Sequence, residues 1–301
     1  MKELDIKISY QCNNNCVFCL NQDKRLFGNT ITDIKNAIIS FTQNDGKRLI
    51  VSGGEPLISR HFFDLLYFAK RQGIISFVIQ TNGRMLYYEP IVLELLKNFD
   101  SITFLVSLHF PNKKLYKKYS QSDGFEQTVG GIKNLIKHNC LFTTNTVVMQ
   151  PNLYHLKEIV YLLKKIGASR QAQYRFIDGK NMLNKYKKFV PSYNECMPVI
   201  REVIEENTDI NFCLREFPIC ILGKKLKDKI APFINSNRLN LVTNNELITT
   251  KTIEENQFIF PDQCTKCIYN EETCPGIRKE YAKIYGIKEF KPIKNCNFLI
   301  D

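Results

Sequence analysis

Three cysteines stand close together near the start of the chain, in the segment Cys12-Asn-Asn-Asn-Cys16-Val-Phe-Cys19. This C-x3-C-x2-C spacing in a polar loop allows three thiolates to reach three corners of a cubane iron–sulfur cluster. Such clusters are usually held by four cysteines, so the group implies either a distant fourth ligand or an iron left open. An open metal position is typical of a catalytic site rather than a structural one.

A zinc site is the alternative interpretation of this loop. Zinc requires a fourth Cys or His at similarly short range. Residues 20–61 offer only His61, which lies beyond the next expected helix. The spacing therefore favours iron–sulfur chemistry.

A second segment with ligand-binding character is Gly53-Gly54-Glu55-Pro56. Paired glycines allow the backbone to come close to a ligand, and the Glu55 carboxylate can accept a charge-assisted hydrogen bond from an ammonium group. An ordinary strand-to-helix turn is the simpler interpretation of these four residues. Their place one strand after the cysteine loop favours a shared binding site.

A further group of cysteines lies near the end of the chain. Cys264-Thr-Lys-Cys267 is followed after six residues by Cys274, a specific metal-binding signature that fits both zinc and iron–sulfur clusters. Cys213 and Cys220 lie upstream, and Cys296 lies downstream. Cys140 and Cys196 have no cysteine close by, so we expect them to be small buried hydrophobic residues.

Regular alternation of strand and helix patterns must position these groups. Strand and helix in alternation imply a parallel sheet, and its chemistry is expected at the carboxyl ends of the strands. Both the cysteine loop and the Gly-Gly-Glu-Pro segment follow such ends. The expected strands are residues 4–10, 48–52, 75–81, 101–108, 141–149 and 171–178. The expected helices between and after them begin near residue 59 or lie near residues 33–42, 91–99, 124–138, 153–167 and 192–207.

These six units predict an α/β fold, a partial (β/α)6 TIM-like barrel, over residues 1–205. The regular alternation stops near residue 180, and six of the eleven cysteines lie in residues 206–301. Residues 206–301 are therefore predicted to form a smaller, cysteine-rich iron–sulfur domain. Within it, Cys220 is expected on a tight, strand-like apolar segment.

The composition is that of a folded soluble protein, with 44% hydrophobic and 24% charged residues. The N-terminus has no signal-peptide pattern, and no apolar run approaches the roughly 20 residues of a membrane span. We therefore expect a cytoplasmic protein without a membrane partner. Thiols stay reduced there, so its clustered cysteines are interpreted as metal ligands before disulfides.

The net charge of +12 comes mainly from scattered lysines, among them Lys113, Lys114, Lys117 and Lys118. Such a surface would attract phosphates, acidic peptides or acidic partner proteins. Solvated helix faces explain scattered lysines equally well. Nucleic acid is a partner that the pattern allows but does not favour.

The cysteine loop, with Phe18 before its third cysteine, resembles that of the radical S-adenosylmethionine (SAM) superfamily, and residues 53–56 are similar to its Gly-Gly-Glu-Pro motif. The resemblance implies that Cys12, Cys16 and Cys19 hold a [4Fe–4S] cluster whose open iron binds SAM. Reductive cleavage of SAM then gives a 5′-deoxyadenosyl radical that abstracts hydrogen from a substrate, chemistry that belongs to the cofactor. The implied SAM-binding residues are Phe18, Gly53, Gly54, Glu55, Pro56, Thr81, Ser107 and Asn145.

Catalytic acid–base groups are less defined by this resemblance. His109, at the end of the fourth strand, and Asp178, on the sixth, are candidate general acids or bases. A lone histidine at a strand end more often forms only local hydrogen bonds.

The C-terminal cysteines are similar to the auxiliary-cluster domains called SPASM or Twitch, which follow the barrel in many radical SAM enzymes. The fuller pattern continues with a cysteine where this chain has Arg278, so one auxiliary [4Fe–4S] cluster is expected. Its predicted ligands are Cys220, Cys264, Cys267 and Cys274, with Cys213 or Cys296 as substitutes for Cys220. A structural zinc is the alternative.

Relatives with auxiliary clusters often modify peptides or protein side chains, and the resemblance favours such a maturase function here. A small metabolite, a nucleotide or RNA is the alternative substrate, and a non-catalytic iron–sulfur protein that binds RNA or a partner is the alternative class. An electron donor such as flavodoxin or ferredoxin is an implied partner. The chain starts on its first strand, so we expect any leader-peptide recognition to come from a separate protein.

Overall fold

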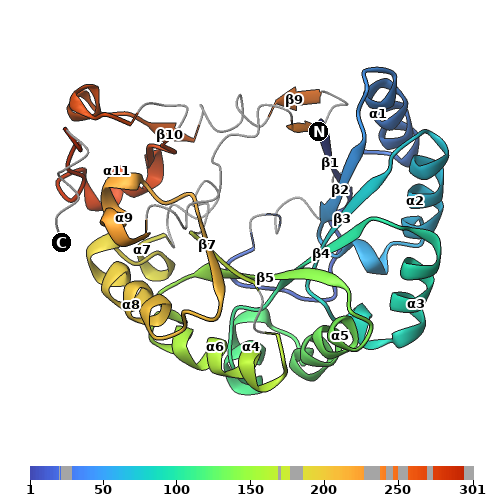
Figure 1. Cartoon of the computed structure of the whole chain (residues 1–301), viewed down its shortest axis with the longest axis horizontal. Coiled ribbons are helices and arrows are strands. Elements are labelled where there is room, and N and C mark those ends of the chain that lie inside the picture. The colour runs from blue at the N-terminus through green and yellow to red at the C-terminus, as the bar shows by residue number, and fades with distance from the viewer. Residues whose placement is uncertain are drawn as a thin grey trace.

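One mainly parallel sheet organises the chain (Figure 1). The computed structural model describes residues 1–19, 21, 29–168, 171–176, 186–226, 238–241, 247–249, 257–269 and 274–294. Within these residues, nine strands pair in the order β7-β6-β5-β4-β3-β2-β1-β8-β9. They are β1 (Glu3–Ser9), β2 (Arg48–Gly53), β3 (Ser76–Thr81), β4 (Ile102–Ser107), β5 (Leu141–Val148), β6 (Gln171–Phe176), β7 (Asn211–Arg215), β8 (Arg238–Leu241) and β9 (Leu247–Thr249).

The expected partial barrel is confirmed, and each of the six expected strands begins and ends within two residues of its predicted bounds. β1 to β7 are parallel neighbours in chain order. Three strands were not expected: β7 extends one edge of the sheet, and β8, parallel to β1, and β9, antiparallel to β8, extend the other. Among the described residues, β7 and β9 therefore form the two edges of an open sheet.

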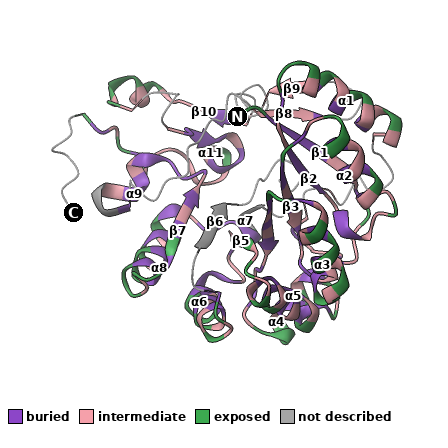
Figure 2. Ribbon diagram, turned by 45° about the vertical axis from the view of Figure 1, so that its right-hand side comes forward, coloured by how far each residue is buried: buried purple, intermediate pink, exposed green. Residues whose placement is uncertain are grey.

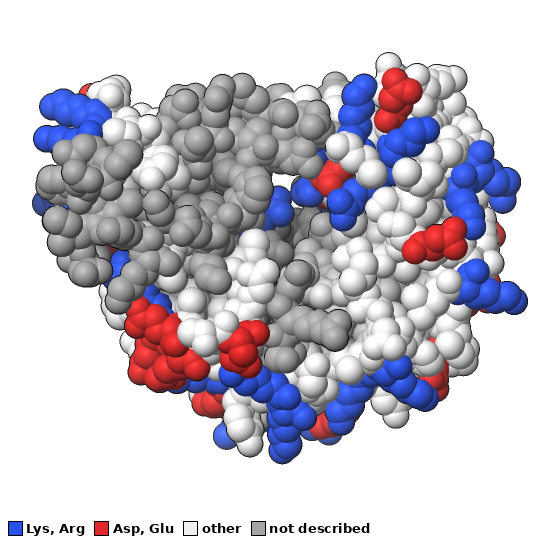
Figure 3. Space-filling view, in the orientation of Figure 1, with Lys and Arg blue, Asp and Glu red and all other residues white. Residues whose placement is uncertain are grey.

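Helices cover the outer, convex face of the curved sheet (Figure 1). Among the described helices, none is long and apolar enough to cross a membrane. On the face shown in Figure 3, basic side chains gather along the lower edge, where α4, α5 and α6 lie in Figure 1. The helices of this layer are α1 (Ile31–Gln43), α2 (Phe62–Arg71), α3 (Glu89–Asn98), α4 (Lys113–Ser120), α5 (Phe125–Lys137), α6 (Leu156–Lys165) and α8 (Tyr193–Glu205).

The hydrophobic core lies between the sheet and these helices, as the buried inner faces of the helices show in Figure 2. β4 illustrates the pattern, because burial alternates along it: Ile102, Phe104 and Val106 are buried, whereas the intervening residues are half-buried. Side chains alternate between the two faces of a strand. The half-buried side chains, including Ser107, therefore face the inside of the partial barrel.

Helix α4 was not expected from the sequence, because it has only eight residues and four of them are lysines. Its start is fixed by the Asn112 side chain, which accepts a hydrogen bond from Leu115 N (3.0 Å). Asparagine is a favoured N-cap residue. Tyr116 and Ser120 form its buried face.

The segment around Cys220 is helical rather than strand-like. Cys220 lies in the first turn of α9 (Ile219–Leu226), and Ile221 N donates to Pro218 O (3.0 Å). Proline is favoured where a helix begins, because the N–H that it lacks would have no helical partner. The local apolar pattern of these few residues fits either type of element, which is why the sequence alone misassigned it.

The described C-terminal residues pack against α8 rather than standing apart from the barrel. Tyr193 N in α8 donates a hydrogen bond to the hydroxyl of Tyr281 (2.7 Å), in α11 (Lys279–Tyr285). Tyr281 and Phe290 belong to the same hydrophobic core as the sheet. The division of the chain at residue 206 stays a prediction, and β7 and this shared core connect the residues on its two sides.

A buried ion pair joins the end of β7 to the short hairpin of β10 (Phe258–Ile259) and β11 (Ile277–Arg278). Arg278 Nη2 contacts Glu216 Oε2, and the side chains are only 2% and 4% exposed. The Arg278 guanidinium also lies over the Phe258 ring, 4.7 Å from its centroid. The pair therefore connects two chain segments that are each close in sequence to a cysteine of the C-terminal group, Cys220 after Glu216 and Cys274 before Arg278.

Replacing Arg278 with methionine leaves the buried Glu216 carboxylate without this cation. We expect Arg278→Met to lower the free energy of unfolding by about 3 to 5 kcal/mol, measured by urea denaturation with far-UV circular dichroism. The double variant Glu216→Leu/Arg278→Met removes both charges, so it should recover most of this loss. A double variant as unstable as Arg278→Met would show that the loss of this cation beside Glu216 is not the cause.

Candidate active site

The first three cysteines lie together beyond the carboxyl end of β1. The pKa of Cys16 is raised to about 12, mainly by burial and also by charge repulsion from Cys19 and Cys12. Burial is also the main cause that raises the pKa of Cys12, to which Cys19 contributes. The Cys12 and Cys16 thiols are therefore protonated near neutral pH, and metal binding must release their protons.

Helix α4 holds the middle of this cysteine loop by backbone hydrogen bonds. Asn15 N donates to Ser120 O (2.9 Å), and Val17 N donates to Tyr119 O (2.9 Å). The Ser120 side chain also hydrogen-bonds Cys16, which lowers the pKa of this thiol against the effect of burial. The last two residues of α4 thus fix the position of the cysteine loop.

Arg84 and Asn82, at the turn after β3, hold the first half of the loop. Arg84 Nη1 donates to Asn13 O and to Asn14 Oδ1 (3.0 Å). Asn82 Nδ2 donates to Asn13 Oδ1 (2.7 Å) and lies 3.7 Å from Cys12 Sγ. Sequence analysis missed both residues as loop supports, because Asn82-Gly83 is an ordinary turn signal and Arg84 belongs to no motif.

Gly53 and Gly54 lie directly against the backbone that leads into Cys12. Gly54 N donates to Ser9 O (2.7 Å). A Cβ atom added to Gly53 would overlap Ser9 O, and one added to Gly54 would overlap Gln11 O. Gly53 also has φ = +132°, a conformation that favours glycine. These glycines allow a close approach of chain to chain, in addition to any approach to a ligand.

The Glu55 carboxylate is fully buried and is held by three donors of the chain itself. Thr81 Oγ1 (2.7 Å) and Leu57 N (3.2 Å) donate to one oxygen, and Asn82 N (2.7 Å) donates to the other. Burial raises the pKa of Glu55 to about 7, against the opposing effect of these hydrogen bonds and of Arg84. Thr81 is therefore a support for Glu55, and Pro56, next in the motif, starts a short 3-10 helix, Pro56–Ile58.

Phe18 and His109 pack edge to face beside the loop, with ring centroids 5.2 Å apart. Val147 N donates to His109 Nδ1 (3.1 Å), and burial lowers the pKa of His109 to about 4. The imidazole is thus neutral near pH 7 and forms the local hydrogen bond expected of a lone histidine at a strand end. A catalytic role for His109 stays a prediction.

Ser107 and Asn145 are cross-strand partners in the parallel pairing of β4 with β5. Both occupy half-buried positions that alternate with core residues, on the face that looks into the partial barrel. Asn145 Oδ1 is buried without a hydrogen-bond partner in the described structure. A buried carbonyl oxygen without a partner is costly, so this atom fits a site where a ligand supplies a donor.

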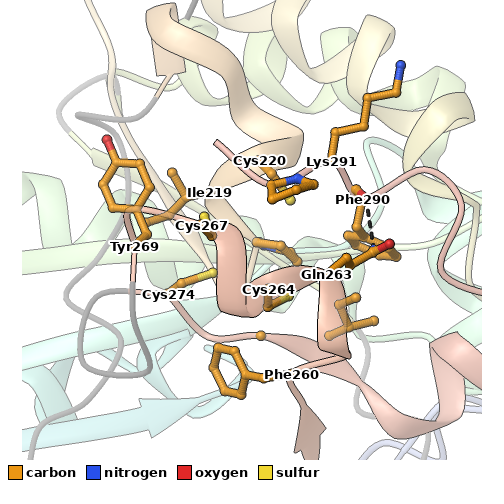
Figure 4. A pocket seen from close by; sticks show the side chains of 14 residues that line it. Ile219, Cys220, Phe260, Gln263, Cys264, Cys267, Tyr269, Cys274, Phe290 and Lys291 are labelled. Atoms are coloured by element: carbon orange, nitrogen blue, oxygen red, sulfur yellow. Dashed lines mark hydrogen bonds between the residues drawn. The ribbon is translucent and has the colours of Figure 1, made fainter. Parts of the chain in front are cut away.

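Four cysteines surround one apolar cavity in the C-terminal region. Figure 4 shows the sulfur atoms of Cys220, Cys264, Cys267 and Cys274 around a common space, with Ile219, Phe260 and Phe290 among the lining residues. The pKa of Cys220 is raised to about 12, mainly by burial and also by charge repulsion from Cys274, Cys264 and Cys267. Four cysteines that line one cavity have the composition of a cluster or zinc site.

The remaining predicted residues lie apart from these two groups or outside the described residues. Cys213 is on β7 and does not line the C-terminal cavity. Cys196 is buried in the main core, as expected, whereas Cys140 is only half-buried against it. Asp178 and Cys296 lie outside the described residues.

Residues 6–170, more than half of the chain, match the Radical SAM superfamily. The cysteine loop, the Gly-Gly-Glu-Pro segment, β4 and β5 all lie within this range. The chain therefore belongs to the radical SAM superfamily, and it is an enzyme.

Curated relatives differ in their named activities. An AdoMet-dependent heme synthase of Methanosarcina barkeri is 32% identical over 52% of this chain, which spans 45% of that relative's length. A probable GTP 3′,8-cyclase of Methanocaldococcus jannaschii is 28% identical over 68% of this chain and 67% of its own length. A second probable GTP 3′,8-cyclase, of Sulfurisphaera tokodaii, is 23% identical over 96% and 93%.

Solved structures share the fold. SuiB of Streptococcus suis, bound to its precursor peptide SuiA, aligns with a TM-score of 0.62 at 16% identity over 82% of this chain and 58% of its own. Native anSMEcpe with bound AdoMet and the Kp18Cys peptide aligns with a TM-score of 0.59 at 15% identity over 96% of both chains. At these identities the similarity establishes the fold alone.

The packing of Gly54 gives a test of the first site. In Gly54→Ala the added Cβ meets the Gln11 backbone, so we expect the cysteine loop to move and the reconstituted protein to lose about four irons per chain. Iron analysis after anaerobic reconstitution measures this. Gly73→Ala is the control for backbone strain away from the loop, because Gly73 has φ = +98° but an added Cβ there has room, 3.8 Å from Lys47 Nζ. Full iron content in Gly54→Ala would contradict the proposed contact.

Proposed function

We propose that this enzyme cleaves SAM reductively and removes a hydrogen atom from a peptide or protein side chain. The grouping of Cys12, Cys16 and Cys19 at the carboxyl edge of the sheet carries the chemical part of this proposal. Three mutually interacting thiols with no fourth cysteine among the described residues of the loop suit a cluster with an open iron.

The residues around the loop fit a bound SAM molecule. The buried, unpartnered Asn145 oxygen and the neighbouring Ser107 suit polar groups of the cofactor. Gly53, Gly54, Glu55 and Pro56 suit its methionine part, with Thr81 holding Glu55 in place. When bound, cluster and SAM together supply one-electron cleavage of the sulfonium bond and hence hydrogen abstraction. Phe18 and His109 close one side of the loop with their rings.

A peptide or protein substrate is supported by the likeness to anSMEcpe, which extends over 96% of both chains and includes the C-terminal region. The open sheet, with β7 and β9 as edges, suits a large substrate. A purine nucleotide is the second candidate, because several curated relatives are named GTP 3′,8-cyclases and the net charge of +12 favours anionic ligands.

The C-terminal cavity is proposed to hold one auxiliary [4Fe–4S] cluster on Cys220, Cys264, Cys267 and Cys274, with zinc as the alternative. Cys213 is less suited as a ligand, because it does not line this cavity. We further propose a cytoplasmic location, since clustered thiols persist in a reducing compartment, and an electron-transfer protein as partner.

The SAM-cleavage proposal is tested by dithionite reduction of the reconstituted protein with SAM under anaerobic conditions. We expect 5′-deoxyadenosine to form and to fall to background in Cys16→Ala, because that variant lacks one cluster ligand. Cys140→Ala, which alters a half-buried thiol away from both groups, is expected to keep full activity. Equal product from Cys16→Ala and the native protein would refute the proposal.

The same assay distinguishes a peptide substrate from a nucleotide substrate when the substrate is deuterated. Side-chain-deuterated peptides should transfer deuterium into 5′-deoxyadenosine, whereas deuterated GTP should not. Transfer from GTP alone would reverse the preference between the two candidates.

Metal analysis tests the C-terminal cluster. A variant with Cys12, Cys16 and Cys19 replaced by alanine should retain about four irons per chain, and the further change Cys267→Ala should remove them. Zinc without iron in the triple variant would contradict the cluster.

A further inference from the structure

The exposed face of α4 carries four lysines on two turns. Lys113, Lys114, Lys117 and Lys118 are all exposed, whereas Tyr116 and Ser120 are buried. Asp123 forms ion pairs with Lys113 (3.4 Å) and Lys117 (3.3 Å). Even with this acid, the segment from residue 113 to 123 keeps a net charge of +3, four lysines less one aspartate.

This charge pattern opposes the stability of the helix. Like charges at i and i+4, as in Lys114 and Lys118, destabilise a helix, and the cations in the first turn oppose the helix dipole, whereas Lys117 and Lys118 in the last turn favour it. The other helices of this layer carry an acid in the first turn: Asp33 in α1, Asp64 in α2, Glu89 in α3, Glu126 in α5, Glu158 in α6 and Glu195 in α8. A local departure from the rules that favour folding is often found at functional sites.

The same helix is in direct contact with the cysteine loop. Its last two residues accept backbone hydrogen bonds from the loop, and Ser120 also hydrogen-bonds Cys16. Lys118 Nζ lies 5.2 Å from the centroid of the Tyr119 ring, and this ring stacks on Phe110 at 4.9 Å. The end of α4 therefore connects the lysine surface with the cysteine loop, through the Tyr119 and Ser120 backbone and the Ser120 side chain.

We propose that the lysine face of α4 is the docking surface for a small acidic electron-transfer protein that reduces the first site. This inference rests on the proposed function, because only a site with a reducible cluster needs such a donor. In each encounter the donor loses one electron and the cluster on Cys12, Cys16 and Cys19 gains it. Complementary charge suits this role because it accelerates a brief association without a large apolar interface.

Binding to a purified acidic flavodoxin tests the surface without any turnover. The double variant Lys114→Glu/Lys118→Glu is expected to bind it about tenfold more weakly at low salt, and less so at high salt. The matched control is Lys97→Glu/Lys165→Glu. It makes the same charge change in the last turns of α3 and α6, and it should bind like the native chain. An equal loss of flavodoxin binding in both variants would show that only net charge matters, and it would overturn the proposal.

A comparison of two reductants tests the docking surface separately from the proposed function. With dithionite, which needs no docking, Lys114→Glu/Lys118→Glu should form 5′-deoxyadenosine at the native rate. With reduced flavodoxin its rate should fall about tenfold, in line with its weaker binding. If neither reductant gives product in the native protein, the proposed function fails. If both support the variant equally, the docking surface fails.

A basic helix also attracts nucleic acid, so a short RNA duplex serves as a competing probe. Loss of RNA binding with unchanged flavodoxin binding in the Lys114→Glu/Lys118→Glu variant would assign the surface to RNA and overturn the proposal.

Discussion

The backbone of residues 9–11 rests directly on Gly53 and Gly54, and the position of the cysteine loop depends on this contact. Gly54 N and Glu55 N donate to Ser9 O and Gln11 O, so the ends of β1 and β2 are fixed to each other. Any Cβ atom between these backbones would overlap a carbonyl oxygen. The same stretch that places Cys12 therefore also places Glu55, and two binding elements of the site share one point of support.

The buried acidic groups of the site are suited to a ligand that carries positive charge. Burial raises the pKa of Glu55 to about 7 and that of Cys16 to about 12, so both groups bind protons more readily than in water. Positive iron favours the thiolate form, and an ammonium group favours the carboxylate form. The protein alone tolerates these buried groups by keeping them neutral or hydrogen-bonded, and the cofactors would complete the electrostatic balance. In the C-terminal cavity, too, an apolar lining surrounds groups that must lose protons to bind metal, its four thiols.

Much of the fold was predictable, because the six alternating units carry strong local patterns. The strand ends, the cysteine loop and the Gly-Gly-Glu-Pro segment follow from residues that are adjacent in the sequence. Helix α4 was missed, since eight residues with four lysines give a weak apolar pattern, and Cys220 was placed on the wrong kind of element. The roles of Arg84 and Asn82 depend on contacts with residues about 70 positions away, which no local pattern encodes.

The two cysteine groups also differ in how much of the chain each requires. The loop around Cys16 is held by Arg84 and by the end of α4, so all of its described supports lie within the first half of the chain. The C-terminal group joins Cys220 to cysteines more than 40 positions later, and the Glu216–Arg278 pair links the same two segments. During synthesis on the ribosome, the first group can assemble while the second half of the protein is still being made. The second group requires Cys274, so its thiols become available later in translation than those of the first group.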